Sequence, residues 1–164
     1  MAEKLFFWEM KWLLLAGLCW LIVESALEKT VYHLNDQLEF QYGYAQAILV
    51  GSTLYISGTM PKDSSSGSGG AGLYPNAFQM ETQMRKIYGD LKATLGHFGL
   101  NFYDVIEESI YTTDMASLNQ AMYIRSEFIS PQAKMTSTTV QIYSLLDPGA
   151  LAAVSLTAAV PSPP

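Results

Sequence analysis

The stretch GYAQAILVGSTLYISG, residues 43–58, predicts a β-hairpin around which the rest of the chain can be arranged. Two apolar runs, Ala47 to Val50 and Leu54 to Ser57, meet at Gly51-Ser52, a pair suited to a two-residue turn because glycine readily adopts a positive φ. Along the second run, apolar side chains alternate with Tyr55 and a serine. One face of the hairpin should therefore pack on a core while the other carries polar groups.

Composition limits the classes of protein and of site. A chain of 164 residues that is 49% hydrophobic and 15% charged suits one compact domain plus an appendage. The net charge of -6 argues against a nucleic-acid surface, which needs clustered Lys and Arg. Cys19 is the only cysteine and cannot form an internal disulfide, while His33 and His97 are too far apart for metal-ligand spacing. The sequence therefore points to no metal, no cofactor and no nucleic-acid partner.

Residues 1–28 differ from the rest of the chain and form a predicted hydrophobic N-terminal helix. Leu5 to Val23 is almost wholly apolar and contains all three tryptophans. Three interpretations are open: a single membrane span, a signal peptide cleaved before Ala26, or a helix buried against a hydrophobic partner. A protein anchored in a membrane by this one helix is the favoured interpretation, and export after cleavage is the alternative.

The globular part is predicted to begin at Lys29. Thr30 to Leu34 alternates as a strand does, and Asn35 to Phe40 is expected to connect it to the hairpin. The glycine- and serine-rich stretch from Asp63 to Gly72 cannot bury a core and predicts a loop. From Asn76 to Phe98, apolar residues recur every three or four positions, which predicts a long helix capped by the glycine that follows.

The second half of the domain repeats the pattern of strand and helix. Asp104 to Thr112 predicts a strand, Ser117 to Ile129 a second helix capped by Asp114, and Thr138 to Tyr143 and Ala152 to Val160 two closing strands. Helices segregated to one face of a mixed sheet make an α+β two-layer fold. The other face of the sheet needs a cover, which self-association or a hetero-complex through the sheet would supply.

Several sequence blocks, taken in order, resemble one known family. The blocks are Tyr44-Ala-Gln-Ala, Leu54-Tyr-Ile-Ser-Gly58, His97-Phe-Gly-Leu100, Asp104-Val-Ile106 with Tyr111-Thr-Thr-Asp-Met115, and Thr138-Thr-Val140 with Gly149-Ala-Leu151. Together they resemble the Rid family, the reactive-intermediate deaminases, also called the YjgF or L-PSP endoribonuclease family. The resemblance runs from about residue 29 to 160 and leaves out residues 1–28 and the tail 161–164. It implies a chorismate-mutase-like fold and a homotrimer with ligand clefts between subunits.

The same resemblance implies where a ligand site would lie. Active family members use an arginine to clamp a substrate carboxylate and a glutamate to position water for hydrolysis of an imine or enamine. In this sequence Ser137 stands at the position of that arginine and Ser155 at that of the glutamate. Tyr44 and Ser57 match the family's tyrosine and strand serine. Lys134 would be the substitute cation if the loop before Ser137 aligns differently.

Two functions therefore stay open. The first is a Rid-like domain that binds a small metabolite of the imine, enamine or carboxylate class between subunits, with deaminase chemistry weak or lost. The second is a non-catalytic accessory subunit of a membrane-associated complex. A serine supplies neither a fixed positive charge nor a carboxylate base, so Ser137 and Ser155 argue against efficient deamination.

Overall fold

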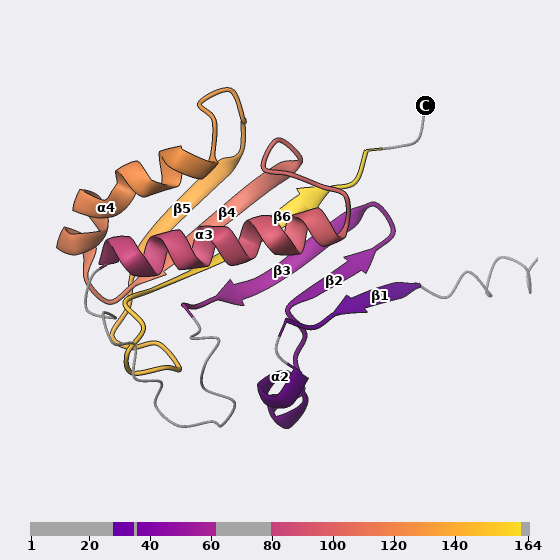
Figure 1. Ribbon diagram of the computed structural model, residues 1–164, viewed down its shortest axis with the longest axis horizontal. Coiled ribbons are helices and arrows are strands. Elements are labelled where there is room, and N and C mark those ends of the chain that lie inside the picture. The colour runs from indigo at the N-terminus through magenta and orange to yellow at the C-terminus, as the bar shows by residue number, and fades with distance from the viewer. Residues whose placement is uncertain (1–27, 35, 62–79, 162–164) are drawn as a thin grey trace, which may run out of the picture.

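The computed structural model describes residues 28–34, 36–61 and 80–161, in which a six-stranded sheet is the central element (Figure 1). Along the chain the elements are β1 (Lys29–Tyr32), α2 (Asp36–Tyr42), β2 (Ala47–Val50), β3 (Thr53–Thr59), α3 (Met80–His97), β4 (Val105–Thr112), α4 (Met115–Phe128), β5 (Thr136–Gln141) and β6 (Ala152–Ala159). The strand order across the sheet is β1-β2-β3-β6-β4-β5.

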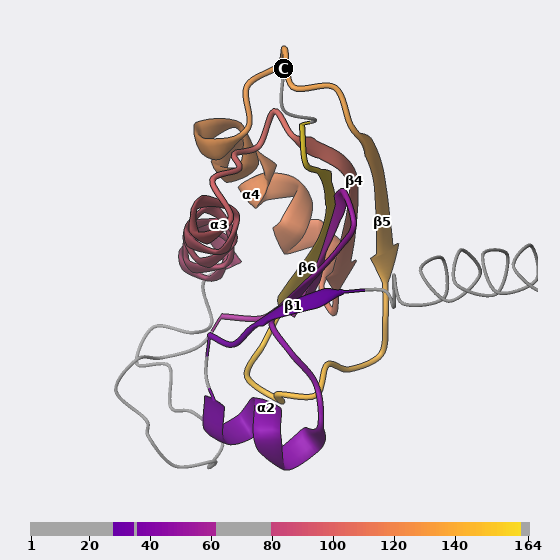
Figure 2. The ribbon, with the colours of Figure 1, turned by 90° about the vertical axis from the view of Figure 1, so that its right-hand side faces the viewer.

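The sheet is mixed, and its long helices lie on one side. Strands β4 and β5, which α4 connects, are parallel, whereas the other neighbouring strands are antiparallel. Figure 2 shows α3 and α4 against one face, while none of the described helices covers the other face, called the open face below. The short helix α2 lies beyond the ends of β1 to β3. The predicted α+β fold with a mixed sheet and two helices on one face is confirmed.

The hairpin has the predicted strands and turn. Strands β2 and β3 pair with Leu49 opposite Leu54, and Gly51 in the turn has a φ of 57°. Leu54 is fully buried beneath the helices, whereas the Tyr55 side chain is 54% exposed on the open face. Burial of the apolar half of each strand fixes this register, because a slip of one residue would exchange the two faces.

The core lies between the sheet and α3. This helix buries one apolar stripe, which includes Met84, Ile87 and Leu91, and it ends where Gly99 adopts a φ of 69°. The N–H of Leu100 then donates to the carbonyl of Leu95 over 2.9 Å, as in a Schellman motif. The expected glycine cap is therefore present.

Helix α2 replaces the connection expected over residues 35–40. Its residues are mostly good helix formers, but seven residues are too few to display a clear apolar period. The helix ends at Gly43, which has a φ of 71°, and the Tyr44 N–H donates to the Glu39 carbonyl over 3.0 Å. A second Schellman motif thus leads the chain directly into β2.

The membrane location predicted from the N-terminal segment requires correction. Within residues 28–34, 36–61 and 80–161, the structure contains no helix that is both long enough and apolar enough to cross a membrane. Helix α3 has 18 residues but carries polar residues at helical spacing, and α4, with 14 residues, is too short. This finding contradicts the predicted location in a membrane. The segment Leu5 to Val23 and most of the predicted loop Asp63 to Gly72 lie outside the described residues.

Candidate ligand-binding site

The residues predicted for the site fall into two groups within one chain. Tyr44 follows α2 and Ser57 lies in β3, while Ser155 lies in the neighbouring strand β6. The register between β3 and β6 shifts at this point, because Ile56 pairs with Leu156 but Thr59 pairs with Val154. This bulge sets Ser57 and its neighbouring glycine opposite Ser155.

The second group is at the other edge of the sheet. Ser137 lies in the edge strand β5 opposite Glu108 of β4, and its hydroxyl donates to that side chain on the helix-covered face. Ser155 instead pairs with Ser109, which in turn pairs with Thr138 on the open face. Ser137 and Ser155 therefore lie on opposite faces of the sheet, and a single chain does not bring these two serines together.

Glu108 is the centre of a buried polar cluster at the β5 edge. Its side chain is fully buried, and one carboxylate oxygen, Oε1, accepts a hydrogen bond from the Tyr88 hydroxyl over 2.8 Å. The other oxygen, Oε2, accepts from Arg125 Nε and from Ser137 Oγ, each over 2.8 Å. Three donors, one of them charged, offset the cost of removing this carboxylate from water.

The electrostatics keep this cluster ordered, and the Arg125 guanidinium, which pairs with Glu108 through Nε, reaches towards the surface. Burial, and then the neighbouring Glu108 charge, raise the pKa of Tyr88 far above its usual value, so this phenol stays protonated and donates. The Arg125 side chain is 21% exposed, and Ser137 beside it is exposed. A guanidinium at this edge is suited to a ligand carboxylate, because its planar fork donates in parallel to two oxygens.

Sequence reasoning did not single out Arg125. The available signal was its position on α4, three residues after Met122, which the family resemblance aligns with an asparagine of the second helix. Residues three apart share one face of a helix. Lys134, the substitute cation that the sequence suggested, is exposed between Ala133 and Met135, which pack against the core. A role for Lys134 remains a prediction.

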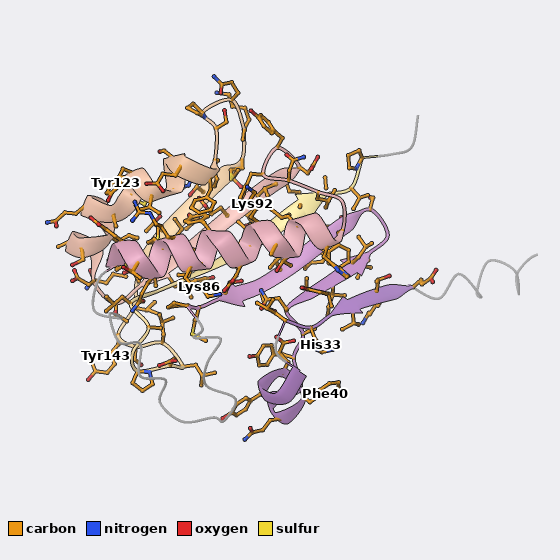
Figure 3. The ribbon with its side chains drawn as sticks, in the orientation of Figure 1. His33, Phe40, Lys86, Lys92, Tyr123 and Tyr143 are labelled. Carbon is orange, nitrogen blue, oxygen red and sulfur yellow. The ribbon has the colours of Figure 1, made fainter. Side chains whose placement is uncertain are left out.

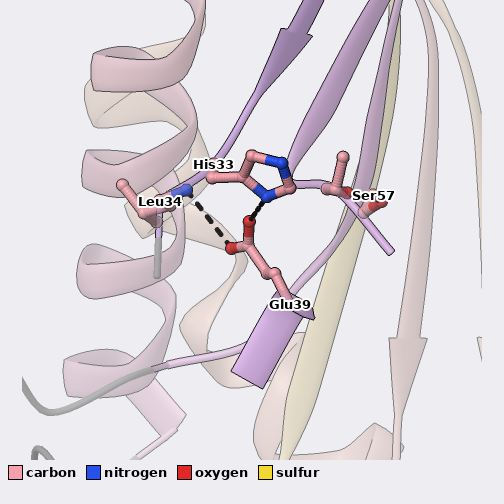
Figure 4. Close-up of polar contacts among 5 residues, drawn as sticks. His33, Leu34, Glu39 and Ser57 are labelled. Carbon is pink, nitrogen blue, oxygen red and sulfur yellow. Dashed lines mark hydrogen bonds and ion pairs between the residues drawn. The ribbon is translucent and has the colours of Figure 1, made fainter. Parts of the chain in front are cut away.

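A second buried carboxylate lies near Tyr44 and Ser57. Glu39 of α2 is fully buried, and its Oε2 lies 2.7 Å from His33 Nδ1 while its Oε1 accepts from the Leu34 N–H over 3.2 Å (Figure 4). The Phe40 ring stacks on the imidazole with 5.0 Å between centroids. Figure 3 shows His33 and Phe40 at one end of the molecule and Tyr123 of α4 at the other.

The backbone beside this pair holds Ser57 in place. Ser57 Oγ donates to the Ala45 carbonyl over 2.6 Å, and the Ser57 N–H donates to the Gln46 carbonyl over 2.8 Å. Partial burial, and then the nearby Glu39 charge, raise the pKa of Tyr44, so its hydroxyl is a donor at neutral pH. The Tyr44 and Ser57 hydroxyl groups thus lie at the same end of the sheet as the His33 imidazole, which Glu39 holds.

The family model described as endoribonuclease L-PSP matches residues 35–160, more than three quarters of the chain. The chain belongs to the endoribonuclease L-PSP family. A RutC family protein of Pyrococcus horikoshii is 28% identical over 102 residues, which cover 62% of this chain and 75% of that protein. This family assignment confirms the resemblance to the Rid or YjgF family that the sequence blocks indicate.

Solved structures of family members have the same fold. A Rid family protein of Yersinia pestis superposes with a TM-score of 0.66 at 22% identity, covering 81% of this chain and all of that one. A YjgF family member of Mycobacterium tuberculosis superposes with a TM-score of 0.65, also at 22% identity, over the same shares of the two chains. At this identity the likeness concerns the fold alone, so a function has to be argued from the residues of this chain.

The family match covers both polar clusters except His33. The match begins at residue 35, so it includes Glu39, Glu108 and Arg125. His33 lies two residues before its start. In residues 28–34, 36–61 and 80–161, no three His, Cys, Asp or Glu side chains are grouped so as to hold a metal ion.

Proposed function

We propose that this family member binds a small metabolite of the imine, enamine or carboxylate class in a cleft between subunits, with deaminase chemistry weak or lost. The observation that carries the proposal is the position of Arg125. Its Nε and the Ser137 hydroxyl donate to the same oxygen of Glu108, so a guanidinium lies next to the position where the family resemblance expects an arginine. A cation for a ligand carboxylate is thus available from α4 although β5 lacks one.

The separation of the two clusters supports a location between subunits. Tyr44 and Ser57 lie at the end of the sheet near α2, whereas Arg125 and Ser137 lie at the β5 edge. One small ligand can contact both groups only if the β5 edge of one subunit meets the Tyr44 end of its neighbour. We propose a homotrimer with such contacts, supported by an open face on which hydroxyl and aromatic side chains are exposed.

Weak chemistry is proposed because a well-placed base is lacking at Ser155. Glu108 does not substitute for that base, since it is fully buried and accepts hydrogen bonds from three donors. Loss of a positioned acid or base typically costs a factor of about 10² to 10⁴ in rate. The same losses favour a second candidate function, a non-catalytic accessory subunit that uses the open face for a hetero-complex.

Calorimetric titration of the full chain with 2-oxobutanoate, a small 2-oxo acid, tests the binding proposal. We expect saturable binding that Arg125→Gln weakens at least about tenfold, because a charge-assisted bidentate contact is lost. Arg85→Gln is the matched control, since Arg85 lies on α3 and pairs with Glu127 on the surface. Circular dichroism of each variant checks that it is folded, and Arg125→Lys, which keeps the charge, should bind with intermediate affinity. The absence of binding by the wild-type chain would overturn the proposal and favour the accessory subunit.

A further inference from the structure

We propose that His33 is the general base of the cleft and that Glu39 positions it; this rests on the proposed function, because the base needs a ligand bound beside Tyr44 and Ser57. The structure sets an imidazole on a buried carboxylate at the end of the sheet where those two hydroxyl groups lie. The residual hydrolysis of this chain would then depend on a residue outside the family match, instead of on Ser155.

The first step of the argument is the tautomer of the ring. Glu39 is fully buried, and its Oε2 lies 2.7 Å from His33 Nδ1, so the ring nitrogen facing it carries the proton. A carboxylate bonded to one ring nitrogen leaves the other nitrogen as an acceptor and fixes the orientation of the ring, as in hydrolase triads. Nε2 is therefore the nitrogen that can accept a proton.

The second step is that the ring is both fixed and reachable. The Leu34 N–H holds the other oxygen of Glu39, and Phe40 stacks on the imidazole at an interplanar angle of 21°. The His33 side chain is nevertheless 24% exposed. Figure 4 shows Ser57 of β3 on the side of the ring away from Leu34. The imidazole is held in one orientation without being sealed from a ligand.

The third step is the position of His33 relative to Ser155, which occupies the place of the family's glutamate. The bulge between β3 and β6 sets Ser57 opposite Ser155, where the family resemblance expects a glutamate. His33 follows β1, and β2 and β3 lie between β1 and the β6 strand that carries Ser155, so this base would act from a different position than the expected glutamate. The protonated Tyr44 hydroxyl near Glu39 adds a donor that can hold the substrate nitrogen or carboxylate.

The proposed reaction is hydrolysis of a 2-imino acid. His33 Nε2 takes a proton from water, and the hydroxide oxygen forms a bond to the imine carbon while the carbon–nitrogen π pair moves to nitrogen, which takes up a proton. The proton that the nitrogen takes up comes from the His33 imidazolium. In the resulting carbinolamine, His33 Nε2 takes the hydroxyl proton and passes it to the nitrogen, so the carbon–oxygen double bond forms as the carbon–nitrogen bond breaks and ammonia leaves. Imine and water thus become a 2-oxo acid and ammonia, with no oxidant or reductant, and His33 returns to its neutral form.

The test compares hydrolysis of an imine generated in situ from an amino acid by the full-length wild-type chain and His33→Gln. We expect His33→Gln to lower kcat at least about tenfold, while the Kd for 2-oxobutanoate changes less than twofold. His97→Gln is the matched control, because His97 is the other histidine and stacks on Tyr32 at 4.2 Å. In His33→Gly, added imidazole should restore turnover, which a purely structural role would not allow. Glu39→Gln should lower kcat as well.

The outcomes separate this inference from the proposed function. Wild-type kcat in His33→Gln, or 2-oxobutanoate binding by a wild-type chain that shows no hydrolysis at all, would overturn the inference and leave the binding function standing. A wild-type chain that does not bind 2-oxobutanoate would overturn both. Failure of imidazole to restore His33→Gly, in a variant that is folded by circular dichroism and binds 2-oxobutanoate, would also count against a general base.

Discussion

Single residues at the β5 edge show how a buried charge can be tolerated. Glu108 has no access to water, yet each of its oxygens has a partner, from α3, α4 or β5. Buried ion pairs contribute little compared with apolar packing, but removing one partner leaves an uncompensated charge. Loss of Glu108 or of Arg125 alone should therefore lower the stability of the fold more than replacement of both by apolar residues.

We predict that Arg125→Met lowers the free energy of unfolding by about 3 kcal/mol at neutral pH, because it leaves the Glu108 carboxylate buried without its cation. Urea denaturation followed by circular dichroism measures the change. Arg85→Met removes an exposed pair and should shift the midpoint little. The double variant Glu108→Leu/Arg125→Met should recover much of the loss, and a double variant less stable than Arg125→Met would contradict this account.

What could be predicted at this scale depended on sequence distance. The cap at Asp114 was expected because its donor is only three residues away, and the Ser117 N–H does donate to Asp114 Oδ1 over 3.0 Å. Glu108 and Arg125 come from different elements 17 positions apart. Their pairing depends on how α4 crosses the sheet, which no local pattern in the sequence reveals.

Elements were predictable where their signals are periodic or involve glycine. The hairpin, α3 and α4 have clear apolar spacing and recognisable ends, and each was predicted close to its observed bounds. Helix α2 was missed because it is short and buries a glutamate, Glu39, where an apolar residue would be expected. At the cluster of His33 and Glu39 a charged side chain is buried where the pattern of hydrophobic residues would place an apolar one. Hydrophobic patterning therefore could not indicate this part of the site.

Two glycine substitutions should change stability in opposite directions. Gly51→Ala should cost about 1 kcal/mol or more, because its φ of 57° is strained for an L-residue although no atom would meet the new Cβ. Gly89→Ala in α3 also meets no atom within 4 Å and should stabilise by about 0.5 to 1 kcal/mol. Thermal or urea unfolding of both variants measures the two changes in the free energy of unfolding. Equal effects of the same sign would show that backbone conformation is not what distinguishes the two sites.

The cap of α4 should make stability depend on acid pH. Hydrogen bonds, first from the Ser117 side chain and then from its N–H, lower the pKa of Asp114 below its usual 3.8. A group with a lowered folded-state pKa stabilises the fold fully above the unfolded-state value, and this contribution is lost as pH falls through the folded-state value. The stability advantage of wild type over Asp114→Asn should therefore be present at about pH 6 and shrink towards about pH 2. Ser117→Ala should reduce the same dependence, and an advantage independent of pH would contradict it.

Across the whole chain, the family and the order of the strands and of the two long helices followed from the sequence, whereas α2 and the location of the protein did not. Hydropathy of Leu5 to Val23 suggested a membrane anchor, but hydropathy alone does not say where an apolar segment is placed. The distribution of the site over opposite faces and ends of one subunit was also beyond sequence reasoning. Ser137 and Ser155 were expected in one cleft. Only contacts between several subunits would bring residues near Ser137 together with residues near Ser155.

Mixing inactive subunits tests that arrangement. If one cleft takes Arg125 from one subunit and His33 from its neighbour, a refolded equal mixture of Arg125→Gln and His33→Gln chains should regain roughly a quarter of the wild-type imine hydrolysis, since that fraction of clefts has both residues. Each variant alone should stay low. Light scattering of the mixture should give a trimer, and the absence of any recovery in intact trimers would place both residues in one subunit or outside the site.

We infer that this chain keeps a ligand cleft of the family but lacks the family's efficient base. Steady-state imine hydrolysis by the full-length wild-type chain and by Ser155→Glu tests it most directly, with 2-oxobutanoate binding measured on both to show that the cleft is intact. We predict slow turnover in the wild type and at least about tenfold faster turnover in Ser155→Glu, because a carboxylate base returns beside Ser57. Rapid wild-type turnover that Ser155→Glu does not increase would contradict the account.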